Sequence, residues 1–340
     1  MIKKIISLVV FLIILISISQ TITIMSYIGN NNIKGSNVSK DIIFAILPYI
    51  YTYGFDSNIM YSGKYIPTNK IDIVTSNHIN TLDFMIQISL IRLFDSRELY
   101  FILKKDVMLI PGCFILASGN DIALNRKMED DVDNITDKIK KIKEGVLVIL
   151  PEGTRFTPEK LKLAQEYSTS NNLPVFNHIL FPKMKGLWTI CNILKNENKL
   201  GNIIDLTIVI ENLKHKKTYL KELVFNKLGT TYVVINSYNI GSNIIEYDNF
   251  KKLFIQIWQK KDNILDNMTL QVNLLRSNNK YKFTKLIPSM KSHEYHILIV
   301  IITLFLYLAI HTNGIYIGVS LFISYFITFI KYKSLKKKYG

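Results

Sequence analysis

A histidine and an aspartate five positions apart are the residues of this chain whose types and spacing most clearly suggest chemistry. His78 follows a β-like apolar run at Ile71–Val74, and Asp83 lies where a helical pattern opens. A carboxylate beside an imidazole fixes the tautomer and stabilises the imidazolium that forms when the ring takes a proton from an alcohol. On a continuous helix an offset of five residues turns about 500°, so the two side chains would not share a face. They can meet only if His78 precedes the first helical turn and Asp83 lies within it, with Asn80 or Thr81 as N-cap.

Taken alone, this pair is weak evidence for catalysis, and its ordinary interpretation is a helix start with a capping Asn and a surface acid. Three later blocks of the chain give it more weight. They are Leu103–Lys105 with Ile110–Phe114 and Asn125–Arg126, then Leu150–Phe156, and then His178–Gly186. Together with Asn77–Asp83 they resemble, in order and spacing, the four motifs of the glycerolipid acyltransferase family. The resemblance covers roughly residues 60 to 240, including a downstream strand pattern at Ile204–Ile208.

Members of this family acylate lysophosphatidic acid and related lysophospholipids. The resemblance implies an enzyme of phospholipid biosynthesis that moves a fatty acyl group from coenzyme A to a free glycerol hydroxyl of a lysophospholipid. It implies His78 as general base and Asp83 as the residue that orients it, and it places the block around Pro182 on the acyl-donor side. The acceptor oxygen would attack the thioester directly, because no Gly-x-Ser-x-Gly elbow is present to indicate an acyl-enzyme. Acyl-CoA is then a co-substrate, and no cofactor or metal is expected.

The residues that follow another predicted strand have the chemistry to bind the acceptor. The run Val146–Leu150 is typical of a buried strand, and open α/β sheets bind ligands at the carboxyl ends of their strands. Gly153 permits close approach of the backbone, and the planar fork of Arg155 can hold two phosphate oxygens. The alternative for Arg155 is a surface ion pair with Glu152. We predict that the acceptor is bound by Arg126, Glu152, Gly153, Thr154 and Arg155.

The overall composition narrows the choice of partners. The 340 residues are 49% hydrophobic with a net charge of +16, a balance that fits nucleic acid, an anionic membrane surface or phosphate-bearing substrates. The sequence has no zinc finger, RNA-binding signature or basic stripe interleaved with aromatic residues, so we expect no nucleic acid partner. Cys113 and Cys191 are far apart and lack metal-ligand spacing, which argues against a disulfide scaffold or a zinc site.

The middle of the chain alternates β-rich and helical patterns. This alternation predicts an α/β fold with a mostly parallel central sheet flanked by helices. Strands are expected near residues 70–76, 98–103, 120–124, 145–150, 177–182, 203–210 and 231–237. Between them, Met128–Lys143 has apolar residues at three- and four-residue spacing, which predicts an amphipathic helix with a charged outer face.

The amino-terminal region has the composition of a membrane segment. Residues 5–33 carry no charge and follow two lysines, so they are long enough to span a bilayer as an uncleaved anchor. A cleaved signal peptide is the alternative, but no small-x-small cleavage site follows the apolar run. A shorter apolar stretch at residues 42–55 contains Pro48 and three tyrosines, which favours an interfacial or re-entrant segment. Its alternative is a first core helix.

The carboxyl-terminal region predicts two short membrane helices. The apolar runs 297–310 and 315–330 are separated by Asn313-Gly314, which breaks a span too long for one crossing. The predicted division of the chain is an anchor with an interfacial segment at 1–55, a catalytic domain at 56–245, a helical and basic connector at 246–295, a membrane hairpin at 296–330 and a basic tail at 331–340. Such carboxyl-terminal helices resemble those of the family subgroup that acylates lysophosphatidic acid, lysocardiolipin or lysophosphatidylinositol.

We therefore expect an integral membrane acyltransferase of the endoplasmic reticulum or another internal membrane, with lysophospholipid, acyl-CoA and the bilayer as partners. Basic clusters beside the membrane segments predict that the catalytic domain faces the cytosol. Two alternatives are an inactive membrane scaffold of the same fold and a lipid hydrolase that uses the same His-Asp pair with water.

Overall fold

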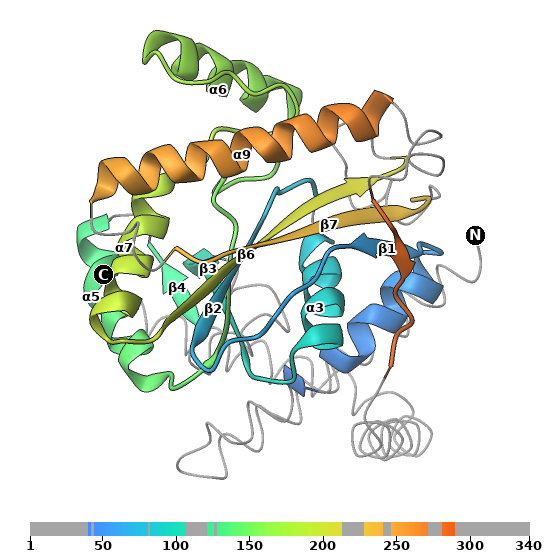
Figure 1. Ribbon diagram of the computed structural model, residues 1–340, viewed down its shortest axis with the longest axis horizontal. Coiled ribbons are helices and arrows are strands. Elements are labelled where there is room, and N and C mark those ends of the chain that lie inside the picture. The colour runs from blue at the N-terminus through green and yellow to red at the C-terminus, as the bar shows by residue number, and fades with distance from the viewer. Residues whose placement is uncertain are drawn as a thin grey trace, which may run out of the picture.

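The computed structural model describes residues 40–41, 44–80, 82–106, 121–125, 128–212, 228–240, 246–270 and 281–289. These residues form an eight-stranded sheet with helices on both faces (Figure 1). The strands are β1 (Ile59–Ser62), β2 (Ile71–Ser76), β3 (Leu99–Lys104), β4 (Ile122–Leu124), β5 (Gly145–Ile149), β6 (Leu200–Ile210), β7 (Thr231–Tyr238) and β8 (Thr284–Lys285). Their order across the sheet is β4-β3-β5-β2-β6-β7-β1-β8.

Most neighbouring strands run parallel. The strands β4, β3, β5, β2 and β6 share one direction, whereas β7 is antiparallel to β6, β1 is parallel to β7, and β8 is antiparallel to β1. The predicted α/β fold with a mostly parallel sheet is thus confirmed for the described residues. Because parallel strands end at the same edge, the carboxyl ends of β2, β5 and β6 lie together, and we call this the carboxyl edge.

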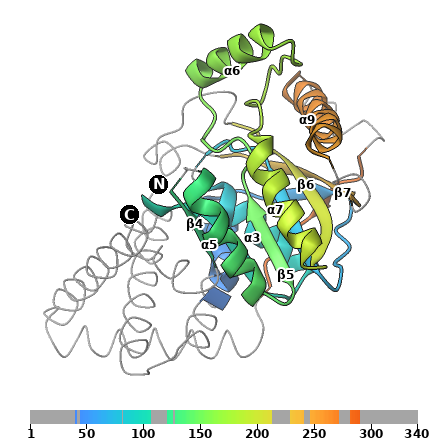
Figure 2. The same cartoon turned by 90° about the vertical axis from the view of Figure 1, so that its left-hand side faces the viewer.

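Helices cover the two faces of the sheet unequally (Figures 1 and 2). The helical elements are η1, a π-helix (Ile50–Gly54), and the α-helices α3 (Asp83–Phe94), α5 (Met128–Lys141), α6 (Pro158–Ser170), α7 (Met184–Asn196) and α9 (Tyr247–Leu270). Buried side chains of α5, α7 and α9 form one hydrophobic cluster with the sheet, and those of α3 and η1 form the other. Figure 2 shows α6 standing away from the sheet, above both layers.

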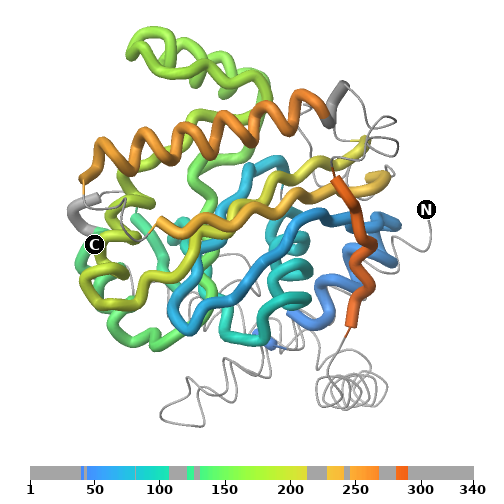
Figure 3. Tube along the Cα trace, viewed as in Figure 1, coloured from blue at the N-terminus to red at the C-terminus, as the bar shows by residue number. Residues whose placement is uncertain are grey.

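The sequence patterns explain these layers. All six residues of β2 and all five of β5 are buried, because central parallel strands covered on both faces read as continuous apolar runs. In α5, Ile135 and Ile139 pack into the core at helical spacing, which confirms the amphipathic helix predicted there. The long helix α9 buries Phe250, Phe254 and Trp258 against α7 and β6 (Figure 3). Although predicted as part of a connector, α9 therefore shares the core of the α/β fold.

One predicted strand is wrong. Residues 177–182 form no strand, whereas the strands predicted at the other positions are present and β1 and β8 were missed. The run is apolar enough for a strand, but its backbone is satisfied by side chains. The N–H groups of Asn177 and His178 donate to the Asp262 carboxylate of α9, at 3.0 and 2.8 Å. Hydrogen bonds to α9, a helix distant in sequence, thus take the place of the pairing with a neighbouring strand.

The predicted membrane segments at 5–33 and 297–330 lie outside the described residues. Within the part of the chain that is described, no helix is both long and apolar enough to cross a bilayer. For the 42–55 stretch, the described residues pack as a core helix would, because Phe44 and Leu47 are buried in the cluster with α3. This packing corresponds to the alternative interpretation of that stretch.

Candidate active site

His78 and Asp83 meet at the carboxyl edge, as their spacing requires. His78 lies in the loop after β2, and Asp83 is the first residue of α3. Their side chains approach to 2.9 Å between Nδ1 and Oδ2, with 19% of the histidine side chain exposed and 1% of the aspartate. Because a carboxylate only accepts, Nδ1 carries the proton and Nε2 keeps its lone pair. The pair has the geometry of a base and its orienter.

The helix start holds the Asp83 carboxylate in place. Its Oδ2 also accepts from the Asn80 N–H at 3.0 Å, and Asn80 Oδ1 accepts from the Leu82 N–H at 2.5 Å. Burial raises the pKa of Asp83, while the hydrogen bond from His78 and the Asn80 N–H oppose that rise. Asn80 thus forms a turn just before the helix, whereas the N-cap position is occupied by Leu82. The N-cap predicted at Asn80 is two residues too early, and Thr81 lies outside the described residues.

Asn77 fixes the same loop to the neighbouring strand. Its Nδ2 donates to the Ile208 carbonyl at 2.9 Å, and its Oδ1 accepts from the Ile208 N–H at 2.8 Å. The side-chain amide continues the β2–β6 ladder where the backbone of β2 departs from it. Sequence reasoning placed Asn77 in the motif without a role. An amide side chain at the end of a predicted strand, next to His78, could have indicated that it pairs with the backbone of the neighbouring strand.

Glu152 supports His78 from the other side. The residue is 2% exposed, and its Oε1 accepts from the His78 backbone N–H at 3.0 Å. The Phe156 N–H donates to the His78 carbonyl at 2.7 Å, so the loop after β5 binds both backbone polar groups of His78. Burial raises the pKa of Glu152 to about 8, against the effects of the His78 N–H and the Lys261 cation. Glu152 therefore contacts the protein's own backbone, and its contact with the acceptor stays a prediction.

Cations gather around the next residues of that loop. Gly153 has a φ of +68°, and a Cβ there would lie 3.1 Å from Cδ of Lys183, so this lysine extends over the glycine. Lys160 Nζ donates to Thr154 Oγ1 at 2.5 Å and to the Arg155 carbonyl at 3.1 Å, and Arg155 is exposed. Lys160 and Lys183 were not predicted as site residues. Their proximity comes from the turn at Gly153, which charge content alone does not reveal.

The remaining predicted site residues divide between described and undescribed parts. Pro182 is buried, and the N–H of the following Lys183 donates to the Pro151 carbonyl at 2.8 Å, which joins the fourth block to the third. Arg126 lies outside the described residues. Among those described, no group of three His, Cys, Asp or Glu side chains converges as metal ligands would.

A second His-Asp pair lies at the surface. His178 Nε2 is 3.0 Å from Asp266 Oδ1 on α9, where 57% of the aspartate side chain is exposed. This pair joins two elements distant in sequence, so spacing gave no sign of it. It repeats the chemistry of the first pair without the buried carboxylate.

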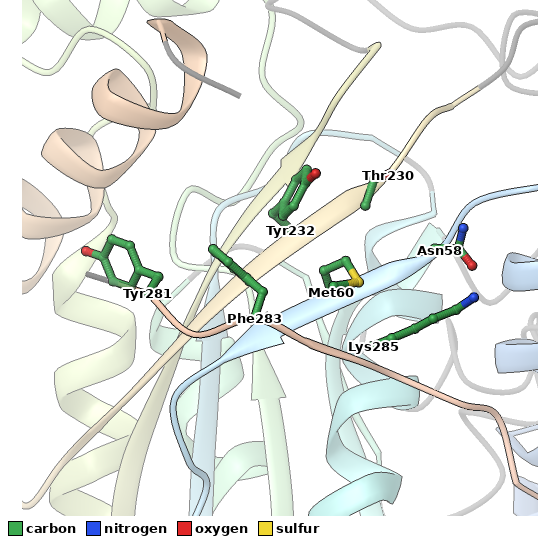
Figure 4. Close-up of a pocket in the computed structure, with 7 residues that line it drawn as sticks. All are labelled: Asn58, Met60, Thr230, Tyr232, Tyr281, Phe283 and Lys285. Carbon is green, nitrogen blue, oxygen red and sulfur yellow. The ribbon is translucent and has the colours of Figure 1, made fainter. Parts of the chain in front are cut away.

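The cavity of Figure 4 is separate from these residues. It has a volume of about 340 Å³ and is lined by Asn58, Met60, Thr230, Tyr232, Tyr281, Phe283 and Lys285. These residues border β1, β7 and β8, and β1 is three strands from β2 in the sheet. At about 4.8 Å per strand, β1 is roughly 14 Å from β2 across the sheet. None of the predicted site residues lines the cavity.

Comparison with known proteins now adds to this geometry. Residues 58–184 match the Acyltransferase family model. A probable 1-acyl-sn-glycerol-3-phosphate acyltransferase 5 from Arabidopsis thaliana is 25% identical over 150 residues, which is 42% of this chain and 40% of that protein. Lysocardiolipin acyltransferase 1 from Danio rerio is 26% identical over 168 residues, covering 47% of this chain and 43% of the relative. The matched part is therefore less than half the length of each relative.

Among solved structures, the 1-acyl-sn-glycerophosphate (LPA) acyltransferase PlsC from Thermotoga maritima has a TM-score of 0.47 and 14% identity, over 78% of this chain and 98% of that one. The family match spans the His78–Asp83 pair and the Glu152–Arg155 loop. Residues 58–184 of this chain are thus similar to the Acyltransferase family model.

Proposed function

We propose that the chain is an acyl-CoA-dependent O-acyltransferase that acylates the free glycerol hydroxyl of a lysophospholipid in phospholipid biosynthesis. The observation that carries this proposal is the pairing of His78 Nδ1 with the buried Asp83 carboxylate at 2.9 Å, inside the part of the chain that matches the family model. The His78 N–H donates to Glu152 and the Phe156 N–H donates to the His78 carbonyl, so the imidazole is pre-positioned at the edge of the sheet where ligands bind.

The pair supplies a complete route for the proton. Nε2 of His78 takes the proton of the acceptor hydroxyl while the oxygen attacks the thioester carbonyl carbon. Asp83 stabilises the imidazolium through Nδ1–H. The tetrahedral intermediate then breaks its carbon–sulfur bond, giving the new ester and the coenzyme A thiolate, and the imidazolium returns the proton to the thiolate. His78 is regenerated without an acyl-enzyme or a metal in any step.

The cations beside Gly153 support a phosphate-bearing acceptor. Arg155 is exposed, and Lys160 and Lys183 flank the same loop. This loop runs from Glu152, which contacts the backbone of His78, to the start of α6. Guanidinium and ammonium groups bind phosphate oxygens through charge-assisted hydrogen bonds. Both relatives described above are named for phosphate-bearing acceptors. A clamp on the phosphate would place the nearby glycerol hydroxyl against His78.

The membrane assignment is part of the same proposal. The uncharged residues 5–33 and the apolar runs between 297 and 330 would anchor the chain in the endoplasmic reticulum or another internal membrane. The acyl-transfer domain would then meet lysophospholipid and acyl-CoA at the cytosolic face of the bilayer.

The test is a panel of acceptors offered with labelled acyl-CoA to purified membranes. Lysophosphatidic acid, lysocardiolipin and lysophosphatidylinositol are compared with monoacylglycerol. Transfer to at least one lysophospholipid is expected. Release of free fatty acid without an acceptor would favour the hydrolase alternative, and no turnover with any acceptor would favour the inactive scaffold.

A further inference from the structure

The helix α9 lies outside residues 58–184, yet one of its faces reaches the supports of the site. Trp258, Lys261 and Asp262 occupy positions i, i+3 and i+4, so they share this face. Trp258 Nε1 donates to the Leu180 carbonyl at 3.0 Å. The Asp262 carboxylate accepts from the backbone N–H groups of Asn177 and His178. The helix therefore determines the path of residues 177–180, where no neighbouring strand does so.

Lys261 is the buried cation of this face. Its side chain is 0% exposed, and its Nζ lies 2.8 Å from Asp205 Oδ1, 2.9 Å from the Leu206 carbonyl and 4.3 Å from the Trp258 ring centre. The same Asp205 oxygen accepts from Thr75 Oγ1 at 2.8 Å. The pair thus joins α9 to β6 and β2 close to the carboxyl edge. Burying both charges is costly, and an apolar pair of similar volume is often as stable or more so.

Two groups associated with α9 also lower the pKa of Glu152. They are the N–H of Leu180, whose carbonyl accepts from Trp258, and the Lys261 cation, and they act beside the hydrogen bond from the His78 N–H. Oε2 of Glu152 is buried and has no hydrogen-bond partner among the described residues. The charge of Lys261 stabilises the ionised carboxylate against burial. The charged groups facing Glu152 are thus Lys261 from α9, with its partner Asp205 on β6, and Asp83 from α3 beside His78.

We propose that Lys261 is a positioning residue for acyl transfer, which acts through Asp205 and Thr75 to hold the end of β2 that leads into His78. This inference rests on the proposed function and extends the working unit beyond the family match to α9. A purely structural role is the competing explanation, in which Lys261 serves only to neutralise Asp205. The two explanations differ in what happens when both charges are removed together.

The experiment compares Lys261→Met with Lys261→Met/Asp205→Asn, and uses Lys260→Met as the matched control. Lys260 is exposed and binds Asn236 on β7 at 3.1 Å, away from Glu152. For Lys261→Met we expect kcat to fall at least about tenfold while KM for acceptor and donor stays within about twofold, because positioning acts on the chemical step. The double variant should recover thermal stability yet keep the low kcat. Recovery of kcat together with stability, or an unchanged kcat in Lys261→Met, would overturn the proposal.

A measurement without turnover separates this proposal from the proposed function. Protein labelled with ¹⁵N-histidine contains six histidines, and His78→Ala identifies the His78 amide signal. That signal should move in Lys261→Met and in the double variant and stay in place in Lys260→Met. If the signal moves but wild-type protein transfers no acyl group, the proposed function fails and the positioning contact stands. If the signal stays in place in every variant, the positioning role is wrong.

Discussion

At the scale of residues, Arg155 tests what the acceptor site binds. Arg155→Lys keeps the charge and loses the two-pronged fork, so kcat/KM for lysophosphatidic acid should fall at least about tenfold while donor KM changes little. Monoacylglycerol, which lacks the phosphate, should be used poorly by wild type and little affected by the change. Arg92→Lys on α3, which faces Asp41 at 3.8 Å, is the matched control. Equal use of both acceptors by wild type would exclude a phosphate clamp.

The raised pKa of Glu152 predicts how the unfolding free energy depends on pH. Its folded pKa of about 8 is raised from 4.5, so the folded state retains a proton that the unfolded state loses. The stability that this bound proton gives to the folded state is fully present below about pH 4.5 and is lost as the pH rises toward 8. From pH 5 to pH 8, wild type should therefore lose at least about 1 kcal/mol more unfolding free energy than Glu152→Gln, since each pKa unit corresponds to about 1.4 kcal/mol. Urea denaturation at both pH values measures this difference.

The control for that comparison is Glu166→Gln, which changes an exposed glutamate on α6 and should follow wild type at both pH values. Parallel loss of stability in wild type and Glu152→Gln would mean that the Glu152 carboxylate is ionised in the folded protein throughout this range.

The residues also differ in how far they could be predicted. His78 and Asp83 are five positions apart, so their meeting depends on one local turn, and the sequence contains that information. The pairing of Lys261 with Asp205 joins positions more than fifty residues apart, so no local spacing along the chain indicates it. Glu152 was recognised from its motif, but its burial could not be read from the chain.

At the scale of elements, the turn after β5 depends on Gly153. Gly153→Ala should destabilise the protein by about 1 kcal/mol or more, because alanine at positive φ is strained and its Cβ would crowd Lys183. Gly186→Ala is the matched control, since its Cβ in α7 would meet nothing within 4 Å and alanine favours a helix. Thermal unfolding should rank Gly186→Ala at or above wild type and Gly153→Ala below it. The reverse order would contradict the turn geometry.

The strands also differ in how far their sequence patterns predicted them. Strands with both faces covered, such as β2 and β5, were recognised from their apolar runs. Residues 177–182 have a similar run, but hydrogen bonds from α9 side chains replace the strand pairing, and those side chains come from far along the chain. The strand β8 has two residues and is exposed, so it carried no apolar pattern at all.

At the scale of the whole molecule, the prediction concerns orientation in the membrane. Lysine-rich flanks tend to stay in the cytosol, so a glycosylation acceptor placed in residues 156–172 should remain unmodified in cells. This region includes α6, which stands away from the sheet and is accessible (Figure 2). An acceptor sequon fused to a secreted reporter serves as the positive control. Glycosylation in the 156–172 region would place the acyl-transfer domain in the lumen.

The central claim is that His78 acts as the base and Asp83 orients it, and steady-state transfer of labelled acyl groups to the best lysophospholipid tests it most directly. His78→Ala should lower kcat by about 10² to 10⁴-fold, the range for a lost general base, and Asp83→Asn should also be severe. His178→Ala, which breaks the surface pair with Asp266, should keep wild-type turnover with equal expression. If His78→Ala retained more than about a tenth of wild-type kcat, His78 would not be the base and the account would be wrong.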